Sequence, residues 1–299
     1  MAGAWTRRRF LAVSAAAIAA SRVTAATPVA MWRGPALGTL AEVRLVGVDD
    51  PDPVFARVEA ELARIDRLFS LYRSDSALVR LNRDGWLEAP DPAILELLSL
   101  SRAMHHATEG AFDPTVQPLF ALHASCAAEG RVPAVEEIEA ARALVSFDQV
   151  TFDMTTVRLA RPGVALTLNG IAQGYATDQL AALLRDEGLR DVMVDAGEVA
   201  GIGNGPEGKG WRVRLPGSDI RLRGQAVATS SATGTLVDPA LGTGHIFDPL
   251  DRRRPSTATI SVIHDSAAIA DALSTAAIVM PGHQLRSFEA LGAKVIRFG

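Results

Sequence analysis

The segment Leu166-Thr167-Leu168-Asn169-Gly170-Ile171-Ala172-Gln173-Gly174-Tyr175-Ala176-Thr177-Asp178 carries the strongest fold signal in this chain. Apolar residues from Val164 to Leu168 predict a strand, and the apolar spacing after Gly170 predicts a long helix to about Glu187. Glycines at such a junction expose backbone N–H groups and let a ligand approach the main chain closely. The same glycines also suit a helix start packed tightly against a sheet, so both interpretations stay open.

Helix and strand patterns flank this segment without a strict βαβ rhythm. Apolar residues at helical spacing predict helices over Val54–Ile65, Asp91–Met104, Ala134–Leu144 and Ala267–Met280. Strands are predicted over Thr39–Val46, the hairpin Val150–Asp153 with Val157–Ala160, Asp191–Asp195, Trp211–Leu215, Ile220–Arg223, Gln225–Thr229 and Thr259–Ile263. Gly201 to Gly205 resembles a truncated dinucleotide motif, but Pro206 interrupts it and we interpret it as a glycine turn. The patterns predict an α+β fold, a mixed sheet flanked by helices, in a single two-lobed domain over residues 27–299.

Composition narrows the function classes. The 299 residues are 48% hydrophobic, which excludes a disordered chain. Charged residues make up 21% and the net charge is -4, which makes a nucleic-acid partner improbable. Cys126 is the only cysteine, so a metal would be held mainly by oxygen or imidazole. The mean hydropathy is +0.16. Because the sequence lacks an uncharged apolar run of about 18 residues, stable membrane insertion is not expected.

The first 26 residues are typical of an export signal. Thr6-Arg7-Arg8-Arg9-Phe10-Leu11 is followed by an Ala-rich apolar stretch to Ala20 and by small residues at Val23 to Ala26. The order Thr-Arg-Arg-x-Phe-Leu resembles the twin-arginine (Tat) pattern, which predicts a periplasmic mature protein. A Sec signal with a chance arginine run and an amphipathic anchor are the alternatives.

Two further segments carry candidate chemistry. Asp271 and Thr275 lie four apart in a predicted helix, so they project from one face and offer oxygen donors to a hard cation such as Mg²⁺. The competing interpretation is that Asp265 caps this helix and that Asp271 faces solvent. His245 stands beside an apolar pair and a turn, where a lone histidine is more often structural than catalytic.

The order of several segments resembles the ApbE family of flavin transferases, which take FMN from FAD and attach it through a phosphoester bond to a threonine of a partner protein. The matching pieces are Ala36–Thr39, Leu71–Ser76 with Leu81-Asn82, Gly110–Val116, Asn169–Asp178, Asp195–Glu198, Thr229–Ser231, His245–Pro249 and Ala270–Thr275. The resemblance covers nearly the whole mature chain and implies an ApbE-like, T-fold-like architecture.

The resemblance also implies site residues. It implies FAD contacts for Leu37, Tyr72, Ala111, Phe112, Asp113, Thr167, Gln173 and Phe247. It implies Mg²⁺ ligation by the carbonyl of Gly170 and by Asp271, Ser274 and Thr275, in agreement with the oxygen-donor argument. Mg²⁺ would offset the pyrophosphate charge while the acceptor threonine attacks the FMN-side phosphorus and AMP leaves. His245 is the best candidate proton acceptor by position, with Asp271 acting through the metal as the alternative.

The chain departs from the family pattern at charged positions. Thr167 replaces an aspartate and Gln173 a lysine, while Ala196-Gly197-Glu198 replaces Gly-Gly-Asp and Thr229-Ser230-Ser231 replaces Thr-Ser-Gly. The leading interpretation is an exported, Mg²⁺-dependent FAD:protein FMN transferase that matures a periplasmic or membrane redox protein, with a respiratory system as one candidate client. A non-catalytic periplasmic FAD-binding accessory protein is the first alternative, and a periplasmic small-ligand binding protein is the second.

Overall fold

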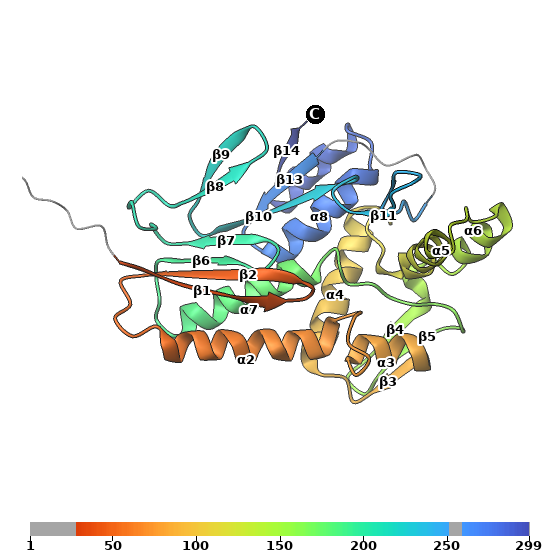
Figure 1. The fold of residues 1–299 in the computed structure, drawn as a ribbon, viewed down its shortest axis with the longest axis horizontal. Helices are drawn as coiled ribbons and strands as arrows, with labels where there is room; N and C mark the ends of the chain where they lie inside the picture. The colour runs from red at the N-terminus through yellow and green to blue at the C-terminus, as the bar shows by residue number, and fades with distance from the viewer. Residues whose placement is uncertain (1–27, 251–258, 299) are drawn as a thin grey trace, which may run out of the picture.

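The computed structural model describes residues 28–250 and 259–298, and the expected export signal lies outside them. A seven-stranded sheet with the order β1-β2-β6-β7-β10-β13-β14 forms its centre (Figure 1). Its strands are β1 (Val29–Ala36), β2 (Thr39–Val46), β6 (Val192–Asp195), β7 (Val199–Ile202), β10 (Gln225–Ser231), β13 (Thr259–His264) and β14 (Lys294–Phe298). The α+β fold is confirmed, and every pairing in the large sheet is antiparallel, whereas we expected a mixed sheet.

Helices cover one face of this sheet. They are α2 (Asp52–Phe69), α7 (Ala172–Asp186) and α8 (Ala267–Val279). Helix α2 turns its regularly spaced apolar residues inward, including Val58 and Ile65. Helix α8 is buried almost all round because its many alanines make it thin enough to lie between the sheet and α4 (Pro92–Ala107). On the opposite face, the hairpin of β8 (Trp211–Leu215) and β9 (Ser218–Leu222) encloses a smaller core.

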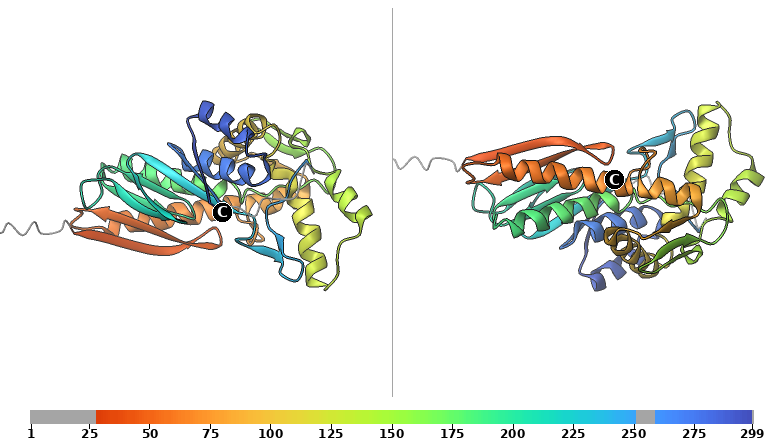
Figure 2. Two further views of the ribbon diagram at one scale, coloured as in Figure 1. Left: turned by 90° about the horizontal axis from the view of Figure 1, so that it is seen from above. Right: turned by 90° about the horizontal axis from the view of Figure 1, so that it is seen from below.

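A second lobe extends from one end of the sheet (Figure 2). Its helices are α4, α3 (Ala77–Asp84), α5 (Gln117–Ala128) and α6 (Val135–Arg142). It also contains a small sheet with the order β3-β5-β4, formed by β3 (Trp86–Glu88), β4 (Val150–Phe152) and β5 (Thr156–Leu159). Short 3-10 helices are η1 (Pro114–Val116), η2 (Phe147–Gln149) and η3 (Gln284–Leu291). The hairpin of β11 (Leu236–Asp238) and β12 (Thr243–Gly244) contacts α5 beside the junction of the lobes.

The segment before α7 is extended but is not a strand, contrary to the prediction for Val164 to Leu168. The side chain of Asn82 takes the place of a neighbouring strand, because its amide donates to the Leu166 carbonyl at 2.8 Å and accepts from the Leu166 N–H at 2.8 Å. The Thr167 N–H donates to the Pro114 carbonyl at 2.8 Å. Side-chain and loop partners thus satisfy a backbone that the alternating pattern assigned to a sheet.

The predicted glycine turn at Gly201 to Gly205 is only partly correct. Gly201 belongs to β7, and a Cβ added there would lie 2.8 Å from the Leu222 Cβ of the covering hairpin. The close approach of two backbones, not a turn, explains this glycine. The turn begins after Ile202, and Gly203 adopts a φ of +73° within it.

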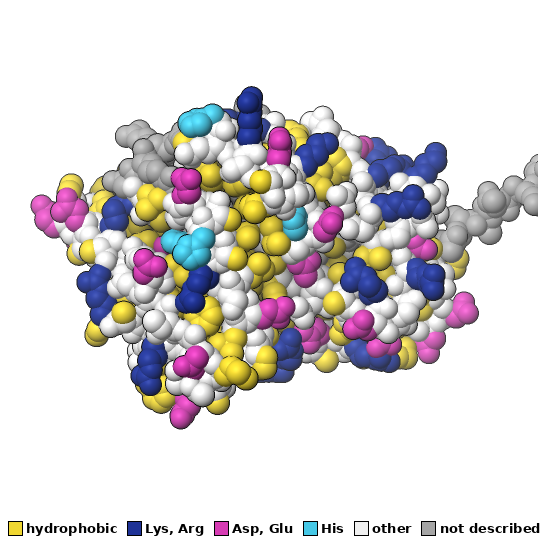
Figure 3. Space-filling model, turned by 180° about the vertical axis from the view of Figure 1, so that it is seen from behind, with side chains coloured by type: hydrophobic (Ala, Val, Ile, Leu, Met, Phe, Trp, Pro, Cys, Tyr) yellow, Lys and Arg dark blue, Asp and Glu magenta, His cyan; other side chains and the backbone are white. Residues whose placement is uncertain are grey.

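Acidic and basic side chains are mixed over the face seen in Figure 3, with apolar side chains between them. The part of the chain that the structure describes contains no helix of the length and apolarity needed to span a bilayer.

Candidate functional site

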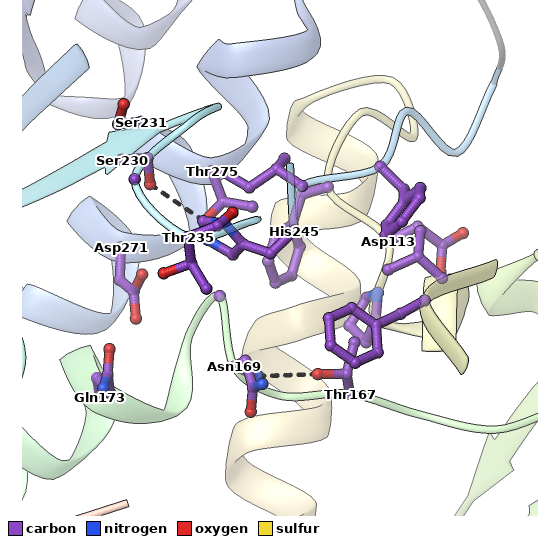
Figure 4. A pocket seen from close by; sticks show the side chains of 18 of the residues that line it. Asp113, Thr167, Asn169, Gln173, Ser230, Ser231, Thr235, His245, Asp271 and Thr275 are labelled. Atoms are coloured by element: carbon purple, nitrogen blue, oxygen red, sulfur yellow. Dashed lines mark hydrogen bonds between the residues drawn. The ribbon is translucent and has the colours of Figure 1, made fainter. Parts of the chain in front are cut away.

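A cavity of about 340 Å³ lies where α7, α8 and the end of β10 face the segment Ala111–Pro114 (Figure 4). Most of the predicted site residues line this cavity: Ala111, Phe112, Asp113, Thr167, Gly170, Gln173, His245, Phe247, Asp271 and Thr275. They come from both lobes, so the fold brings together residues more than 150 positions apart in the sequence. Three predicted residues, Leu37, Tyr72 and Ser274, do not line it.

Close packing of α7 on α8 places Asp271 beside this cavity. A Cβ added to Gly174 would lie 2.3 Å from the carbonyl oxygen of Ala267, so only glycine permits this approach. The Gly174 N–H consequently reaches Asp271 Oδ2 at 3.1 Å. The tight-packing interpretation of the glycine junction is thus confirmed at this residue, and approach of a ligand to the backbone stays a prediction.

The start of α8 corrects the cap prediction. Ser266, not Asp265, is the N-cap, and its hydroxyl accepts from the Ile269 N–H. Asp178 of α7 accepts from the N–H groups of Ala267 and Ala268 at 2.7 and 3.0 Å. Asp271 is only 3% exposed, so the competing interpretation of a solvated side chain is wrong. The expected one-turn spacing of Asp271 and Thr275 on a single helix is confirmed.

Burial governs the charge of Asp271. It raises the pKa of this carboxyl to about 7, against the opposing effect of the Gly174 N–H, and nearby Asp178 adds to the rise. Glu198, also at the cavity wall, is 9% exposed and has a pKa raised well above its usual range by burial and by the charge of Asp271. The structure gives neither carboxyl an ion pair with a lysine or arginine among its described residues. Burial therefore favours the neutral form of both carboxyls, and a bound cation would stabilise their ionised form.

Glu198 lines the cavity but was not among the predicted site residues. One of its oxygens accepts from the Thr229 N–H at 3.1 Å, and its backbone carbonyl accepts from Thr177 Oγ1 at 2.9 Å. The signal was an acidic residue in Asp195–Glu198, a segment that the family resemblance had already singled out. Its proximity to Asp271 depends on how α7 packs against both β7 and α8, which the sequence alone does not reveal.

Oxygen atoms dominate the wall near Asp271. Thr275 packs on Gly170, where an added Cβ would lie 3.0 Å from Thr275 Oγ1. Figure 4 shows the contact of Ser230 Oγ with Thr275 Oγ1 at 3.5 Å. Ser274 is fully buried beside the cavity, where its hydroxyl bonds to Ser230 Oγ at 2.7 Å and to the Asp271 carbonyl at 3.0 Å. Ser274 thus supports the wall, and ligation by it stays a prediction.

The donor set fits a hard cation. Carboxylate, hydroxyl and carbonyl oxygens are the ligands that Mg²⁺ prefers, and a dry carboxylate without a basic partner is the charge that such an ion neutralises. In the ranges 28–250 and 259–298, histidine, cysteine, aspartate and glutamate side chains do not gather in groups of three or more that could hold a metal. A metal here would therefore rely on hydroxyl, carbonyl, water or ligand oxygens as well as Asp271.

Asp113 organises the opposite wall and does not point a free carboxylate at a ligand. Its oxygens accept from the Thr115 N–H at 2.8 Å, from Thr115 Oγ1 at 2.6 Å and from the Phe147 N–H at 3.1 Å. Burial raises its pKa, and the hydrogen bonds from Thr115 oppose the rise. Asp113 therefore fixes the loop that presents Ala111 and Phe112 to the cavity.

The two neutral departures from the family pattern both face the cavity. The Gln173 side chain covers Gly197, where an added Cβ would lie 2.6 Å from Gln173 Cδ. Thr167 Oγ1 accepts from the Asn169 N–H at 3.3 Å (Figure 4). Phe247 forms an aromatic wall with His123, at a centroid distance of 4.9 Å. No lysine or arginine lines this cavity among the described residues.

His245 has a defined tautomer if its ring is neutral. Nδ1 lies 3.1 Å from the carbonyl oxygen of Thr235, and because a carbonyl only accepts, Nδ1 carries the proton. The lone pair of a neutral ring then lies on Nε2. Figure 4 places the ring centrally among the lining side chains, between Asp271 and Asp113. The geometry suits a proton acceptor, and that role of His245 stays a prediction.

Leu37 and Tyr72 lie at a second hollow of about 650 Å³ between β1 and α2. Leu37 forms the β1–β2 turn with a φ of +45°, and a Cβ added to Gly38 would lie 3.2 Å from the Tyr72 ring. Tyr72 is 78% exposed, so it does not pack in the core. The structure thus leaves both residues outside the first cavity, and flavin contacts by them stay a prediction.

The fold and cavity define an α+β protein with an oxygen-rich ligand site between two lobes. The sequence model of the ApbE family matches residues 37–295, and the chain therefore belongs to the ApbE family.

Named relatives agree with this assignment. The FAD:protein FMN transferase of Vibrio cholerae is 28% identical over 268 residues, covering 83% of this chain and 80% of the relative. That of Klebsiella pneumoniae is 29% identical over 271 residues, covering 83% and 77%.

Solved structures give the same result. The flavin transferase ApbE from Vibrio cholerae has a TM-score of 0.78 and 25% identity, covering 91% of this chain and 93% of that one. The apo form of Pseudomonas stutzeri flavinyl transferase ApbE has a TM-score of 0.77 and 28% identity, covering 91% and 92%.

Proposed function

We propose that this chain is a Mg²⁺-dependent FAD:protein FMN transferase, which attaches FMN through a phosphoester bond to a threonine of a redox protein. The observation that carries the proposal is the charge of the cavity. Glu198 and Asp271 line it, and no lysine or arginine does so among the described residues. In their ionised form these carboxylates would repel a pyrophosphate, and a cation bound with it would both favour that form and remove the repulsion, as in a metal-dependent phosphoryl-transfer site.

The chain's own residues fit the parts of this reaction. Asp271 and Thr275 on α8, with the carbonyl of Gly170, would hold the Mg²⁺. The ion would neutralise charge on the FAD pyrophosphate when bound. Phe112 and Phe247 provide apolar walls for the flat parts of the ligand.

His245 would accept the proton of the acceptor threonine. Its Nδ1–H is fixed on the Thr235 carbonyl, so Nε2 of the neutral ring is the atom that takes the proton. The threonine oxygen bonds to the FMN-side phosphorus, the bond between that phosphorus and the bridging oxygen breaks, and AMP leaves.

We also propose that the reaction takes place in the periplasm after export by the Tat pathway, and that the client is a periplasmic or membrane redox protein. The Thr-Arg-Arg-Arg-Phe-Leu run at residues 6–11 supports the route. An export system for folded proteins is compatible with a site assembled from both lobes of the chain.

The neutral Thr167 and Gln173 favour a second candidate function. Loss of one charged contact near a diphosphate costs about 1 to 3 kcal/mol, and a weakened site would suit an accessory protein that binds FAD without using it. Incubation of mature protein with FAD, Mg²⁺ and a peptide of the Asp-x-x-(Ser/Thr)-Gly-Ala-Thr type separates the two. The transferase releases AMP and adds one FMN to the peptide, whereas the accessory protein retains intact FAD. Absence of any bound-flavin absorbance would support a small-ligand binding protein instead.

A further inference from the structure

The wall formed by Phe112 and Asp113 follows a turn with unusual backbone geometry. Helix α4 ends at Ala107, and Glu109 and Gly110 then adopt φ values of +52° and +80°. A left-handed conformation is unfavourable at a residue other than glycine, so surrounding contacts must hold this turn. The contacts made by the turn therefore decide where Phe112 stands in the cavity.

Two side chains of the end of α4 hold the Phe112 backbone. The Phe112 N–H donates to Thr108 Oγ1 at 3.0 Å, and Thr108 Oγ1 donates to the Met104 carbonyl at 2.7 Å. His105 Nδ1 lies 3.0 Å from the Phe112 carbonyl oxygen and 3.5 Å from Asp113 Oδ2. Both of these oxygens are acceptors, so Nδ1 is the protonated nitrogen and it donates to the wall.

The His105 ring is itself fixed by packing. It lies against the Phe147 ring at a centroid distance of 5.7 Å and an interplanar angle of 30°. The N–H of the same Phe147 donates to Asp113 Oδ2 at 3.1 Å, so these three residues form a closed set of contacts. His105 does not line the main cavity but borders a separate hollow of about 260 Å³ behind it.

We propose that His105 is a positioning residue, which fixes the Phe112–Asp113 wall of the FAD cavity from outside through its Nδ1–H. This inference rests on the proposed function, because it takes FAD as the ligand of the cavity. His105 touches no ligand atom, and its effect is on the affinity for FAD. The hydrogen bond comes from the Nδ1 position, because Nδ1 is the ring nitrogen that lies near both acceptors.

Two amide substitutions test this geometry. In His105→Asn the side-chain NH2 occupies nearly the position of Nδ1, whereas in His105→Gln the amide reaches the position of Nε2. We expect the Gln variant to raise the Kd and the KM for FAD about tenfold, with kcat within about twofold of wild type. The Asn variant is expected to restore wild-type binding. His106→Asn and His106→Gln are matched controls, because His106 is the exposed neighbour on the same helix.

The Kd is measured by flavin fluorescence with Mg²⁺ present, and KM and kcat are measured by AMP release. Equal FAD affinity of the Asn and Gln variants would overturn the proposal, as would an effect confined to kcat or an equal effect of the His106 substitutions. If wild-type protein binds FAD without releasing AMP, the proposed transfer reaction fails, while the Kd values still decide the role of His105.

Discussion

Replacing Asp271 by asparagine removes a charge that burial opposes at the cavity wall. The carboxyl is 3% exposed and its pKa rises from 3.8 to about 7 on folding. Each pKa unit corresponds to about 1.4 kcal/mol, so the ionised side chain costs the metal-free fold about 4 kcal/mol at alkaline pH. We therefore expect Asp271→Asn to be more stable than wild type without metal, by about 2 to 4 kcal/mol once the imperfect hydrogen bonding of the amide is included.

The sign of the pH dependence follows from the raised pKa. Between about pH 4 and pH 7 the folded carboxyl retains a proton that the unfolded carboxyl has lost, so wild-type stability falls as the pH rises through this window. The difference between the variant and wild type should be near zero at about pH 4 and should reach its full size at about pH 8. Mg²⁺ should restore stability to wild type at the higher pH and leave Asp271→Asn unchanged.

Thermal unfolding at both pH values, with and without Mg²⁺, tests these expectations together with AMP release. Asp195→Asn is a matched control: burial also raises the pKa of Asp195, but this residue does not line the cavity. The control should keep its Mg²⁺-dependent stabilisation and its AMP release, and Asp271→Asn should lose both. An equal Mg²⁺ shift in wild type and Asp271→Asn, or full AMP release by that variant, would refute the metal site.

Three further variants test the second hollow, the packing of α7 on α8 and the export route. Tyr72→Ala should leave thermal unfolding unchanged, because the ring is 78% exposed. The same change should weaken FAD binding by about 1 to 3 kcal/mol, because it removes a stacking face. Unchanged FAD affinity, measured by flavin fluorescence, would place the ligand away from the second hollow. Gly174→Ala would place a Cβ 2.3 Å from the carbonyl oxygen of Ala267. Denaturant unfolding should therefore show that the free energy of unfolding falls by more than about 3 kcal/mol. A smaller decrease would mean that α7 and α8 can separate. Lysine in place of both Arg7 and Arg8 should retain the precursor in the cytoplasm, and a normal periplasmic yield in fractionated cells would exclude Tat export.

Local pattern predicts the helices of this fold better than the strands. The spacing of Val58, Leu62 and Ile65 is enough to define α2, because a helix of 18 residues repeats its apolar face several times. By contrast, the alternation from Val164 to Leu168 is real, yet the neighbour of this segment is the side chain of Asn82. A strand requires a partner, and the identity of that partner is set by distant contacts.

Elements that the sequence analysis overlooked have interrupted or uniform patterns. Strand β1 carries Gly34 and Pro35, which weaken its alternation, and at a sheet edge a proline is tolerated because one side of the strand needs no donor. Helix α5 is apolar on all sides, so its periodicity is weak. Strand β7 contains Gly201, and a glycine is needed there because the hairpin of β8 and β9 packs closely against it.

The sequence predicts which site residues lie together when both residues belong to one helix. Asp271 and Thr275 share a helical face, so their spacing alone brings them together. The pairing of Asp271 with Glu198 spans two elements, and the role of Asp113 as a loop anchor depends on Phe147, which is remote in sequence. Residue chemistry thus indicated the kind of site, and topology determined which acidic groups share it.

Two acidic side chains of this cavity lack basic partners among the described residues, and this affects how strongly a cation and a pyrophosphate would bind together. Hydrogen bonds from Thr115 and Phe147 occupy the carboxylate of Asp113, whereas Glu198 and Asp271 lack a basic partner in the described chain. Without a cation, a pyrophosphate and these carboxylates repel each other, and without a pyrophosphate the cation keeps more of its water. If the cavity binds both ligands as proposed, each should strengthen the binding of the other, and by thermodynamic reciprocity the enhancement should be equal in both directions. The neutral Gln173 strengthens this coupling, because no fixed cation at that position substitutes for the metal.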